Sequence, residues 1–362
     1  MKQAHFYMPA GEINPFGNGA SKRSAQISAL LLLHFQIENI NILPGTFFSK
    51  FSRYYHALKF LLANPIKIST FRDFSILGYH YLNGKKNINN YKGNPQYLFW
   101  ESTLNNYHYK PLLYKKMGCK LIAFPHNLES LVPGQISVVS EKPSPLWLDE
   151  ELEQLRLCDH VFTISEEEQW FLSLNKIKST YYPYFPTKIL KEKLLSIRKQ
   201  REHFILNNFY LMFGSFFYEP IGRGLLEVLQ VLNETNSHIK ITGFGCDNLV
   251  NGIEYNLNGN IEVLGETTPG DLNKLLAECK GVIINQALSS GALTKLKELQ
   301  IAGVPVLLNE ASTRSFKNVN GFYVYRDFIE LKNLLDKDLE IPNLPENNDF
   351  YDNRIIHIIN NL

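Results

Sequence analysis

The chain has 362 residues, of which 44% are hydrophobic and 20% are charged, so it is long enough for two globular domains. No apolar run reaches the roughly 18–20 residues that a membrane span needs, and the first residues, MKQAHFYMPAGE, lack the apolar core of a signal peptide. The four cysteines lie far apart and form no CxxC pair, which favours free thiols in a cytoplasmic protein over a structural metal site.

The net charge of +2 is unevenly distributed along the chain. Up to Lys120 there are fifteen Lys and Arg residues but only four Asp and Glu residues, and the remainder is net acidic. A basic first part can attract an anionic membrane surface, nucleic acid or a phosphorylated acceptor, and it can also simply keep a surface rich in Phe and Tyr soluble. Because the sequence contains no recognised nucleic-acid-binding module, we expect no nucleic-acid partner.

Short apolar runs alternate with helical stretches from the first residues onward. The first run, KQAHFYMP, leads into a Gly-rich loop and a helix over 21–35. Further strands in the first half are predicted at 96–101, 119–127 and 159–165, and further helices at 147–158 and 166–175. After the stretch YYPYFP and a basic helix over 188–201, the alternation starts again. Strands are predicted at 209–215, 238–245, 261–266, 280–286 and 304–310, and helices at 222–233, 269–279, 294–302 and 353–362.

Two such series predict an α/β protein with two doubly wound, Rossmann-like domains, because strand–helix alternation is typical of parallel sheets covered on both faces. We place the first domain at 1–190 and the second at 191–340, with a tail over 341–362 whose helix returns to the first domain. Ligands of open α/β sheets bind at the carboxyl ends of the strands, so we expect the two domains to face each other across a cleft.

The stretch SSGALTKLKELQIAGVPVL, residues 289–307, has charged residues just after the junction between a predicted strand and the helix that follows it. Lys295 lies in the first turn of the predicted helix, where the free backbone amides already favour an anion such as phosphate. Glu298 follows on the same helical face and can accept hydrogen bonds from a ribose diol. Gly291 allows close approach of the backbone. The stretch therefore predicts a binding site for a nucleotide diphosphate.

The pattern G-x-x-x-K-x-x-E-x-x-x-x-G-x-P-V resembles the donor-binding signature of glycosyltransferase family 4 enzymes, which have the GT-B fold. It is formed here by Gly291, Lys295, Glu298, Gly303, Pro305 and Val306. Other segments resemble the family in the same order, from about residue 95 to 310: FPHN, CDHVFTIS, YYPYFP, YLMFGSFFYEPIGRG, KITGFG and IEVLGETTPGDLNKLLAEC.

The resemblance implies a retaining glycosyltransferase that needs no metal and no other cofactor. Its donor would be a nucleotide-diphosphate sugar of the UDP or GDP type, bound by the second domain. Its acceptor would be a glycan or a lipid-linked molecule, bound by the first domain, in bacterial-type surface polysaccharide or glycoconjugate synthesis. Such an enzyme would be cytoplasmic or peripheral on the inner face of the membrane, and an anionic membrane surface would then be a partner.

The resemblance also implies roles for individual residues. Arg223 and Lys295 would bind the diphosphate, and His126 would donate a hydrogen bond to the donor sugar or its phosphate. Gly17 and Gly19, in the loop after the first strand, would approach the diphosphate and the sugar.

Two positions depart from the family pattern. Ser290 stands where many members have a Glu, so Ser289 and Ser290 would contact the sugar instead. Ser215 stands in the phosphate-binding loop where an Arg is common, and Arg223 roughly replaces a Lys there. The remaining candidates lie beside the predicted nucleotide base: Gly243, Gly245 and Thr267.

Several alternatives remain open. Glu101, at the end of a predicted strand, can contact the acceptor or cap a helix. The same scaffold can serve a nucleotide-sugar epimerase or hydrolase, and Ser290 also suits a non-catalytic nucleotide-binding subunit of a glycosyltransferase complex.

Overall fold

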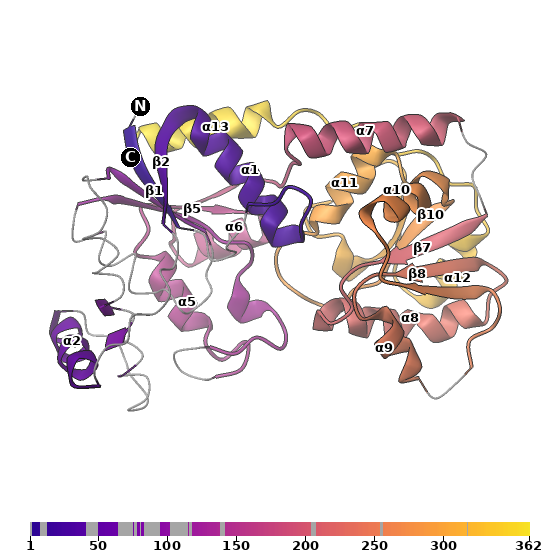
Figure 1. Ribbon diagram of the computed structural model, residues 1–362, viewed down its shortest axis with the longest axis horizontal. Coiled ribbons are helices and arrows are strands. Elements are labelled where there is room, and N and C mark those ends of the chain that lie inside the picture. Colours follow the sequence, from indigo (N-terminus) through magenta and orange to yellow (C-terminus); the bar gives the residue numbers. More distant parts are fainter. Residues whose placement is uncertain are drawn as a thin grey trace. The chain divides into compact units, whose positions relative to one another are not determined.

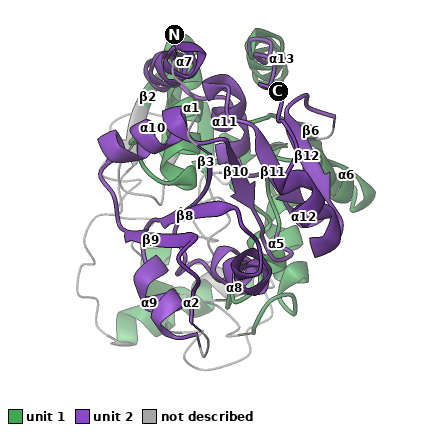
Figure 2. Cartoon of the chain, turned by 90° about the vertical axis from the view of Figure 1, so that its right-hand side faces the viewer, with its two compact units in different colours: residues 1–184, 290–292, 348–362 green, residues 185–289, 293–347 purple. Residues whose placement is uncertain are grey.

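The computed structural model contains two parallel six-stranded sheets with helices on both faces (Figure 1). The residues that it describes are 2–7, 13–40, 50–63, 95–101, 118–137, 142–203, 208–253, 256–316 and 318–362, together with residues 75, 78, 79, 81, 82 and 115. They form two compact units (Figure 2). Unit 1 comprises Met1–Tyr184, Ser290–Ala292 and Asn348–Leu362, and unit 2 comprises Phe185–Ser289 and Leu293–Asn347.

Unit 1 is built on a sheet with the strand order β2-β1-β3-β4-β5-β6. Its strands are β1 (Lys2–Tyr7), β2 (Phe35–Ile40), β3 (Tyr97–Glu101), β4 (Lys120–Phe124), β5 (His160–Thr163) and β6 (Ser179–Tyr181). Its helices are α1 (Gly19–His34), α2 (Lys50–Ala63), η2 (Glu129–Leu131), α5 (Leu148–Leu155), α6 (Glu166–Leu174) and α13 (Asp349–Asn360).

The central strands β3, β4 and β5 are buried along almost their whole length, which explains their nearly continuous apolar runs. One core joins the sheet to α1 and α13, and a second core joins its other face to α5 and α6. The chain reverses its strand order between β1 and β3, so the loops that follow these two strands leave the sheet at a topological switch point.

Unit 2 has the strand order β12-β11-β10-β7-β8-β9. Its strands are β7 (Phe209–Phe213), β8 (His238–Thr242), β9 (Ile261–Gly265), β10 (Gly281–Ile284), β11 (Val306–Asn309) and β12 (Phe322–Tyr325). Its helices are α7 (Lys188–His203), α8 (Glu219–Asn233), α9 (Cys246–Asn251), α10 (Pro269–Glu278), α11 (Thr294–Ala302), η3 (Glu310–Ser312) and α12 (Phe328–Leu335).

In unit 2, α7, α10 and α11 pack on one face of the sheet, and α8, α9 and α12 pack on the other. The switch point lies between β7 and β10, so the loops after these strands are where a ligand of this sheet would bind.

The predicted α/β class with two doubly wound sheets is confirmed. Several elements were not predicted, among them β2, α2, β12 and α12. The last two residues of the predicted first strand, 8 and 9, lie outside the described residues. Among the helices of the described ranges, none combines the length and the apolar character that crossing a bilayer requires.

Candidate functional site

A small cavity in unit 2 opens at the switch point of the sheet. Its lining includes Phe213 and Phe216 from the end of β7 and the loop after it, Ile284, Asn285 and Gln286 from the end of β10, and Lys295 from α11. The cavity therefore lies where the fold predicts a ligand site, and Lys295 supplies it with a positive charge.

Lys295 reaches the end of β7 from the first turn of α11. Its Nζ donates a hydrogen bond to the Phe213 carbonyl oxygen at 3.2 Å and lies 5.2 Å from the centre of the Phe213 ring. The neighbouring Gly214 has no side chain, and a Cβ there would lie 3.5 Å from this Nζ. The ammonium group is thus held against bare backbone at the carboxyl end of the central strand.

The N-terminus of α11 carries no side-chain cap. Leu293 is the N-cap residue and offers no side-chain acceptor, and the first turn contains no acidic residue. Backbone N–H groups at such an end favour an anion. Glu298, one turn further along α11, is half-buried, and Gly303 ends the helix in the left-handed conformation with φ 71°.

The loops after β7, β8 and β9 contact one another through their backbones. Gly243 has φ 130°, and a Cβ there would overlap the carbonyl oxygen of Gly214. The Thr242 hydroxyl lies 2.8 Å from the Gly265 carbonyl oxygen and 2.9 Å from the Thr267 hydroxyl. This packing brings the loops of Ser215, Gly245 and Thr267 to one edge of the sheet.

Two exposed aromatic side chains lie at the same edge. Phe217 follows β7 and Phe244 follows β8, and their ring centres are 4.9 Å apart. They are 62% and 55% exposed, and Gly245, with φ 82°, packs against the ring of Phe217. Exposed rings of this kind offer flat surfaces for a nucleotide base.

The loop after β10 is held by residues that the sequence analysis did not identify. Arg314 donates from Nη1 to the carbonyl oxygen of Ser289 at 2.6 Å, and its Nη2 lies 3.4 Å from Gln286 Oε1. The hydroxyls of Tyr218 and Ser289 are 3.2 Å apart. The only sequence signal for Arg314 is its position shortly after the strand predicted at 304–310.

Arg223 lies on the exposed face of α8, with 66% of its side chain accessible. Its Nε is 3.1 Å from Glu227 Oε1, one turn further along the helix. It is not among the residues that line the cavity.

Residues 290–292 belong to unit 1 although they follow β10 in the chain. The Ser290 hydroxyl donates to the Leu128 carbonyl oxygen at 3.0 Å. The Gly291 N–H donates to Glu168 Oε1 at 2.9 Å, and the Leu128 N–H donates to the same oxygen at 2.8 Å. Gly291 has φ 74°, and a Cβ there would overlap Asn127.

Glu168 is thus a buried acceptor for two backbone amides. Burial raises the pKa of its carboxyl group to about 7, while the hydrogen bonds from Leu128, Ser165 and Gly291 act in the opposite direction. Ser165 caps α6 by accepting a hydrogen bond from the Glu168 N–H at 3.2 Å.

Gly17 lies in the loop before α1, and Gly19 is the first residue of that helix. Asn18 Oδ1 accepts a hydrogen bond from the Ser21 N–H at 2.9 Å, and the Gly17 N–H donates to the Asn14 carbonyl oxygen at 3.1 Å. A Cβ on Gly17 would lie 2.9 Å from the Ser21 Cβ, so this turn fits glycine closely.

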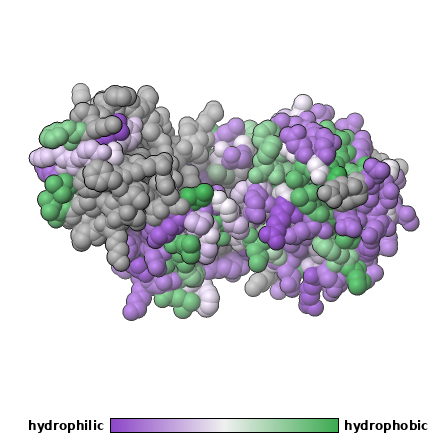
Figure 3. All heavy atoms as spheres, turned by 90° about the horizontal axis from the view of Figure 1, so that it is seen from below, coloured by the Kyte–Doolittle hydropathy of each residue, from purple (hydrophilic) through white to green (hydrophobic). Residues whose placement is uncertain are grey.

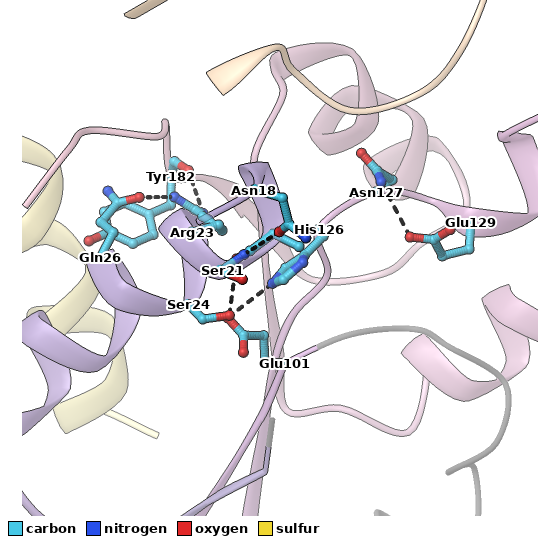
Figure 4. A network of polar contacts seen from close by, with 11 residues as sticks. Asn18, Ser21, Arg23, Ser24, Gln26, Glu101, His126, Asn127, Glu129 and Tyr182 are labelled. Carbon is cyan, nitrogen blue, oxygen red and sulfur yellow. Dashed lines mark hydrogen bonds and ion pairs between the residues drawn. The ribbon is translucent and has the colours of Figure 1, made fainter. Parts of the chain in front are cut away.

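His126 and Glu101 form a buried pair close to this loop (Figure 4). Glu101 is the last residue of β3 and is fully buried, and its Oε1 lies 3.0 Å from His126 Nε2, which follows β4. The sequence allows Glu101 to contact the acceptor or to cap a helix. In the structure its carboxyl group pairs with His126. Within the described ranges, no group of three or more His, Cys, Asp or Glu side chains could hold a metal ion.

Comparison with known proteins identifies the fold. No protein-family model and no curated protein matches the chain. Sucrose-phosphate synthase from Thermosynechococcus elongatus is similar in structure, with a TM-score of 0.62 and 13% identity over 92% of this chain and 88% of that chain. Anabaena HepE in complex with UDP has a TM-score of 0.57 and 14% identity over 93% and 89%.

UDP-GlcNAc 2-epimerase from Methanocaldococcus jannaschii is also similar in structure, with a TM-score of 0.52 and 12% identity. The match covers 100% of this chain and 100% of that chain. Sequence identities this low show that the fold is shared but do not show that the activity is shared. The two doubly wound sheets and their likeness to these structures give the chain the GT-B fold.

Proposed function

We propose that the chain is a glycosyltransferase that moves a sugar from a UDP-sugar onto a glycan or lipid-linked acceptor. The observation that carries this proposal is Lys295, whose ammonium lies at the switch point of the second sheet beside an uncapped helix N-terminus. The UDP class is favoured because HepE is seen with UDP and with UDP-glucose, and the epimerase is named for a UDP-sugar.

In this proposal the diphosphate binds at the start of α11. Lys295 and the first-turn amides stabilise the charge that develops on the leaving diphosphate as its bond to the sugar breaks. Glu298 accepts hydrogen bonds from the ribose. The base stacks on one of the two exposed rings at that edge, Phe217 or Phe244, whose planes are inclined by 55° to each other. Gly243, Gly245, Thr267 and Ser215 would line the same part of the site.

The chemistry requires no dedicated base. The bond between the anomeric carbon and the diphosphate oxygen breaks, the acceptor oxygen bonds to the same face of that carbon, and the acceptor proton passes to the leaving phosphate oxygen. This retaining, metal-independent route is what the family resemblance implies. His126, held by Glu101, would donate a hydrogen bond to the sugar. Arg223 would have to leave Glu227 to bind phosphate, so we assign the main cationic role to Lys295.

A UDP-sugar epimerase or hydrolase is the second candidate, because the epimerase structure covers the whole chain. Measuring UDP release with and without an acceptor panel separates the two, since only a transferase depends on the acceptor. Binding of UDP without any turnover would instead favour a non-catalytic subunit.

Lys295→Gln tests the site, with Lys297→Gln as the matched control on the same helix. Lys297 lies two residues further on, donates to Gln300 Oε1 at 3.1 Å and lies over the Phe316 ring. We expect Lys295→Gln to lower turnover by about 100-fold or more and to remove most of the thermal stabilisation by UDP. Lys297→Gln should keep both. Equal behaviour of the two variants would disprove the assignment.

A further inference from the structure

Gln286 is a buried polar residue of unit 2 that has no role in the proposed mechanism. It follows β10 at the switch point of the sheet, lines the cavity of Lys295 and is only 2% exposed. Hydrophilic side chains are numerous on the surface of unit 2 seen from below, where water satisfies them (Figure 3). A buried amide is different, because each end that lacks a hydrogen-bond partner costs stability. Its contacts therefore indicate what the cavity binds.

The backbone of Gln286 is fixed by the side chain of Asn309, at the end of β11. The Gln286 N–H donates to Asn309 Oδ1 at 3.2 Å, and Asn309 Nδ2 donates to the Gln286 carbonyl oxygen at 2.8 Å. These two hydrogen bonds hold the residue beyond the point where the pairing of β10 with β11 ends. The side chain of Gln286 is therefore presented from a rigid backbone.

The side-chain amide of Gln286 has one end facing Arg314. Its Oε1 accepts a hydrogen bond from Arg314 Nη2 at 3.4 Å, while Arg314 Nη1 donates to the Ser289 carbonyl oxygen at 2.6 Å. A guanidinium group has donors only, so the amide oxygen faces it and the amide NH2 group faces away. Within the described residues Nε2 makes no hydrogen bond, and it keeps some accessible surface, so an atom in the cavity can reach it.

The other polar side chains of the cavity indicate the charge of its ligand. Asn285 is engaged at both ends, because its Nδ2 donates to the Gly224 carbonyl oxygen and its Oδ1 accepts from the Tyr325 hydroxyl, each at 2.8 Å. Lys295 brings a positive charge, and the lining residues that the structure describes include no Asp or Glu. An ammonium group and an amide NH2 group in one cavity fit an anion with several acceptor oxygens.

The strand order β10-β7-β8-β9 indicates which phosphate lies nearest to Gln286. The exposed rings of Phe217 and Phe244 follow β7 and β8, whereas Gln286 follows β10, on the other side of β7. Neighbouring strands lie about 4.8 Å apart, so the ends of β8 and β10 are roughly 10 Å apart. A nucleotide whose base stacks on these rings would bring its β-phosphate, the group farther from the base, towards β10.

We propose that Gln286 Nε2 donates a hydrogen bond to the β-phosphate of the bound UDP-sugar, and that Arg314 is the positioning residue that keeps this NH2 group turned towards the cavity. The inference rests on the proposed function and adds a second side chain beside Lys295 that binds the leaving diphosphate. Because the NH2 group is oriented before the sugar bond breaks, it stabilises the charge that grows on the β-phosphate without rearranging.

Calorimetric titration of the full chain with UDP and with UMP tests the contact. Gln286→Leu removes the NH2 group at similar size. It should weaken UDP binding about tenfold or more and change UMP binding less than twofold, since UMP has no β-phosphate. Gln286→Glu presents only acceptor oxygens and should weaken UDP binding about 100-fold. Its carboxylate can pair with Arg314, so its melting temperature should stay close to that of the unchanged protein.

The matched control is Gln300→Leu. Gln300 is a buried glutamine of α11, 7% exposed, whose Nε2 donates to the Asn343 carbonyl oxygen at 3.2 Å and which does not line the cavity. The control should lower the melting temperature but keep UDP binding. Arg314→Gln should weaken UDP binding about fivefold in the unchanged protein and less than twofold in the Gln286→Leu background, because the amide that Arg314 orients is then missing.

Unchanged UDP binding by Gln286→Leu, or an equal loss for UDP and UMP, would overturn the contact with the β-phosphate. An undiminished effect of Arg314→Gln in the Gln286→Leu background would overturn its positioning role. If the chain binds UDP but transfers no sugar, the proposed transferase fails while a selective loss in Gln286→Leu still supports the contact. Absence of UDP binding by the unchanged protein would contradict both.

Discussion

Glu101 is fully buried at the end of β3, and neither of its carboxyl oxygens has a hydrogen-bond partner among the described residues. Oε1 lies 3.0 Å from His126 Nε2, within ion-pair distance. Arg23, itself 1% exposed, lies near enough for the charge of Glu101 to act on it: burial lowers the pKa of its guanidinium, and Tyr182 and Glu101 oppose this. A buried carboxylate is costly unless it is paired, so the contact with His126 offsets part of the cost of burying Glu101.

Glu168 gives the first unit a predictable dependence on pH. Its pKa is raised from 4.5 to about 7, so between these values the folded chain holds a proton that the unfolded chain releases. The free energy of unfolding should therefore fall as the pH rises across this window, by up to about 3 kcal/mol. Glu168→Gln should remove this dependence and stabilise the protein at pH 8.

Urea unfolding at pH 5 and pH 8 measures this difference. Glu153→Gln, at an exposed position of α5, is the control and should follow the unchanged protein at both values. If the free energy of unfolding of Glu168→Gln depends on pH as it does in the unchanged protein, another group causes this dependence.

At the scale of single elements, the loops of unit 2 depend on glycine where two backbones meet. Gly243 combines φ 130° with direct contact to the Gly214 carbonyl, and both features exclude a Cβ. We expect Gly243→Ala to lower the free energy of unfolding of unit 2 by at least about 2 kcal/mol and to weaken UDP binding.

Gly259→Ala is the matched control, because nothing lies within 4 Å of a Cβ at that position. Thermal unfolding with and without UDP compares the two variants. If both melt alike and bind UDP alike, the packing of the loops after β7 and β8 is not what shapes the site.

At the scale of the whole molecule, the chain returns to its first unit at its end. In α13, Ile355 and Ile359 are fully buried in the core that also contains Phe6 and Phe99. Asp352 accepts a hydrogen bond from the Tyr182 hydroxyl at 2.8 Å. The first sheet therefore completes its core with residues from the end of the sequence, and it should not be stable without them.

Ile355→Ala should cost unit 1 about 2–5 kcal/mol, because it leaves a cavity in this core. Phe350→Ala, at a position of α13 that is 68% exposed, should cost much less. Calorimetry should show a lower unfolding temperature of unit 1 for Ile355→Ala than for the unchanged protein, and a much smaller change for Phe350→Ala. Equal transitions would mean that α13 contributes little to the core of unit 1.

The sequence by itself determined the α/β class, the two series of strands and the position of Lys295 at the start of a helix, because these depend on local apolar patterns and on residues close together in the chain. It did not reveal β2, because the apolar end of α1 runs directly into FQIENI, with no turn residue between helix and strand. Only the tertiary structure decided that Glu101 pairs with His126 and that Arg314 holds the loop of Ser289. Each of these contacts joins residues that are distant in sequence, and such contacts are set by how the strands are ordered in the sheets, which no local pattern encodes.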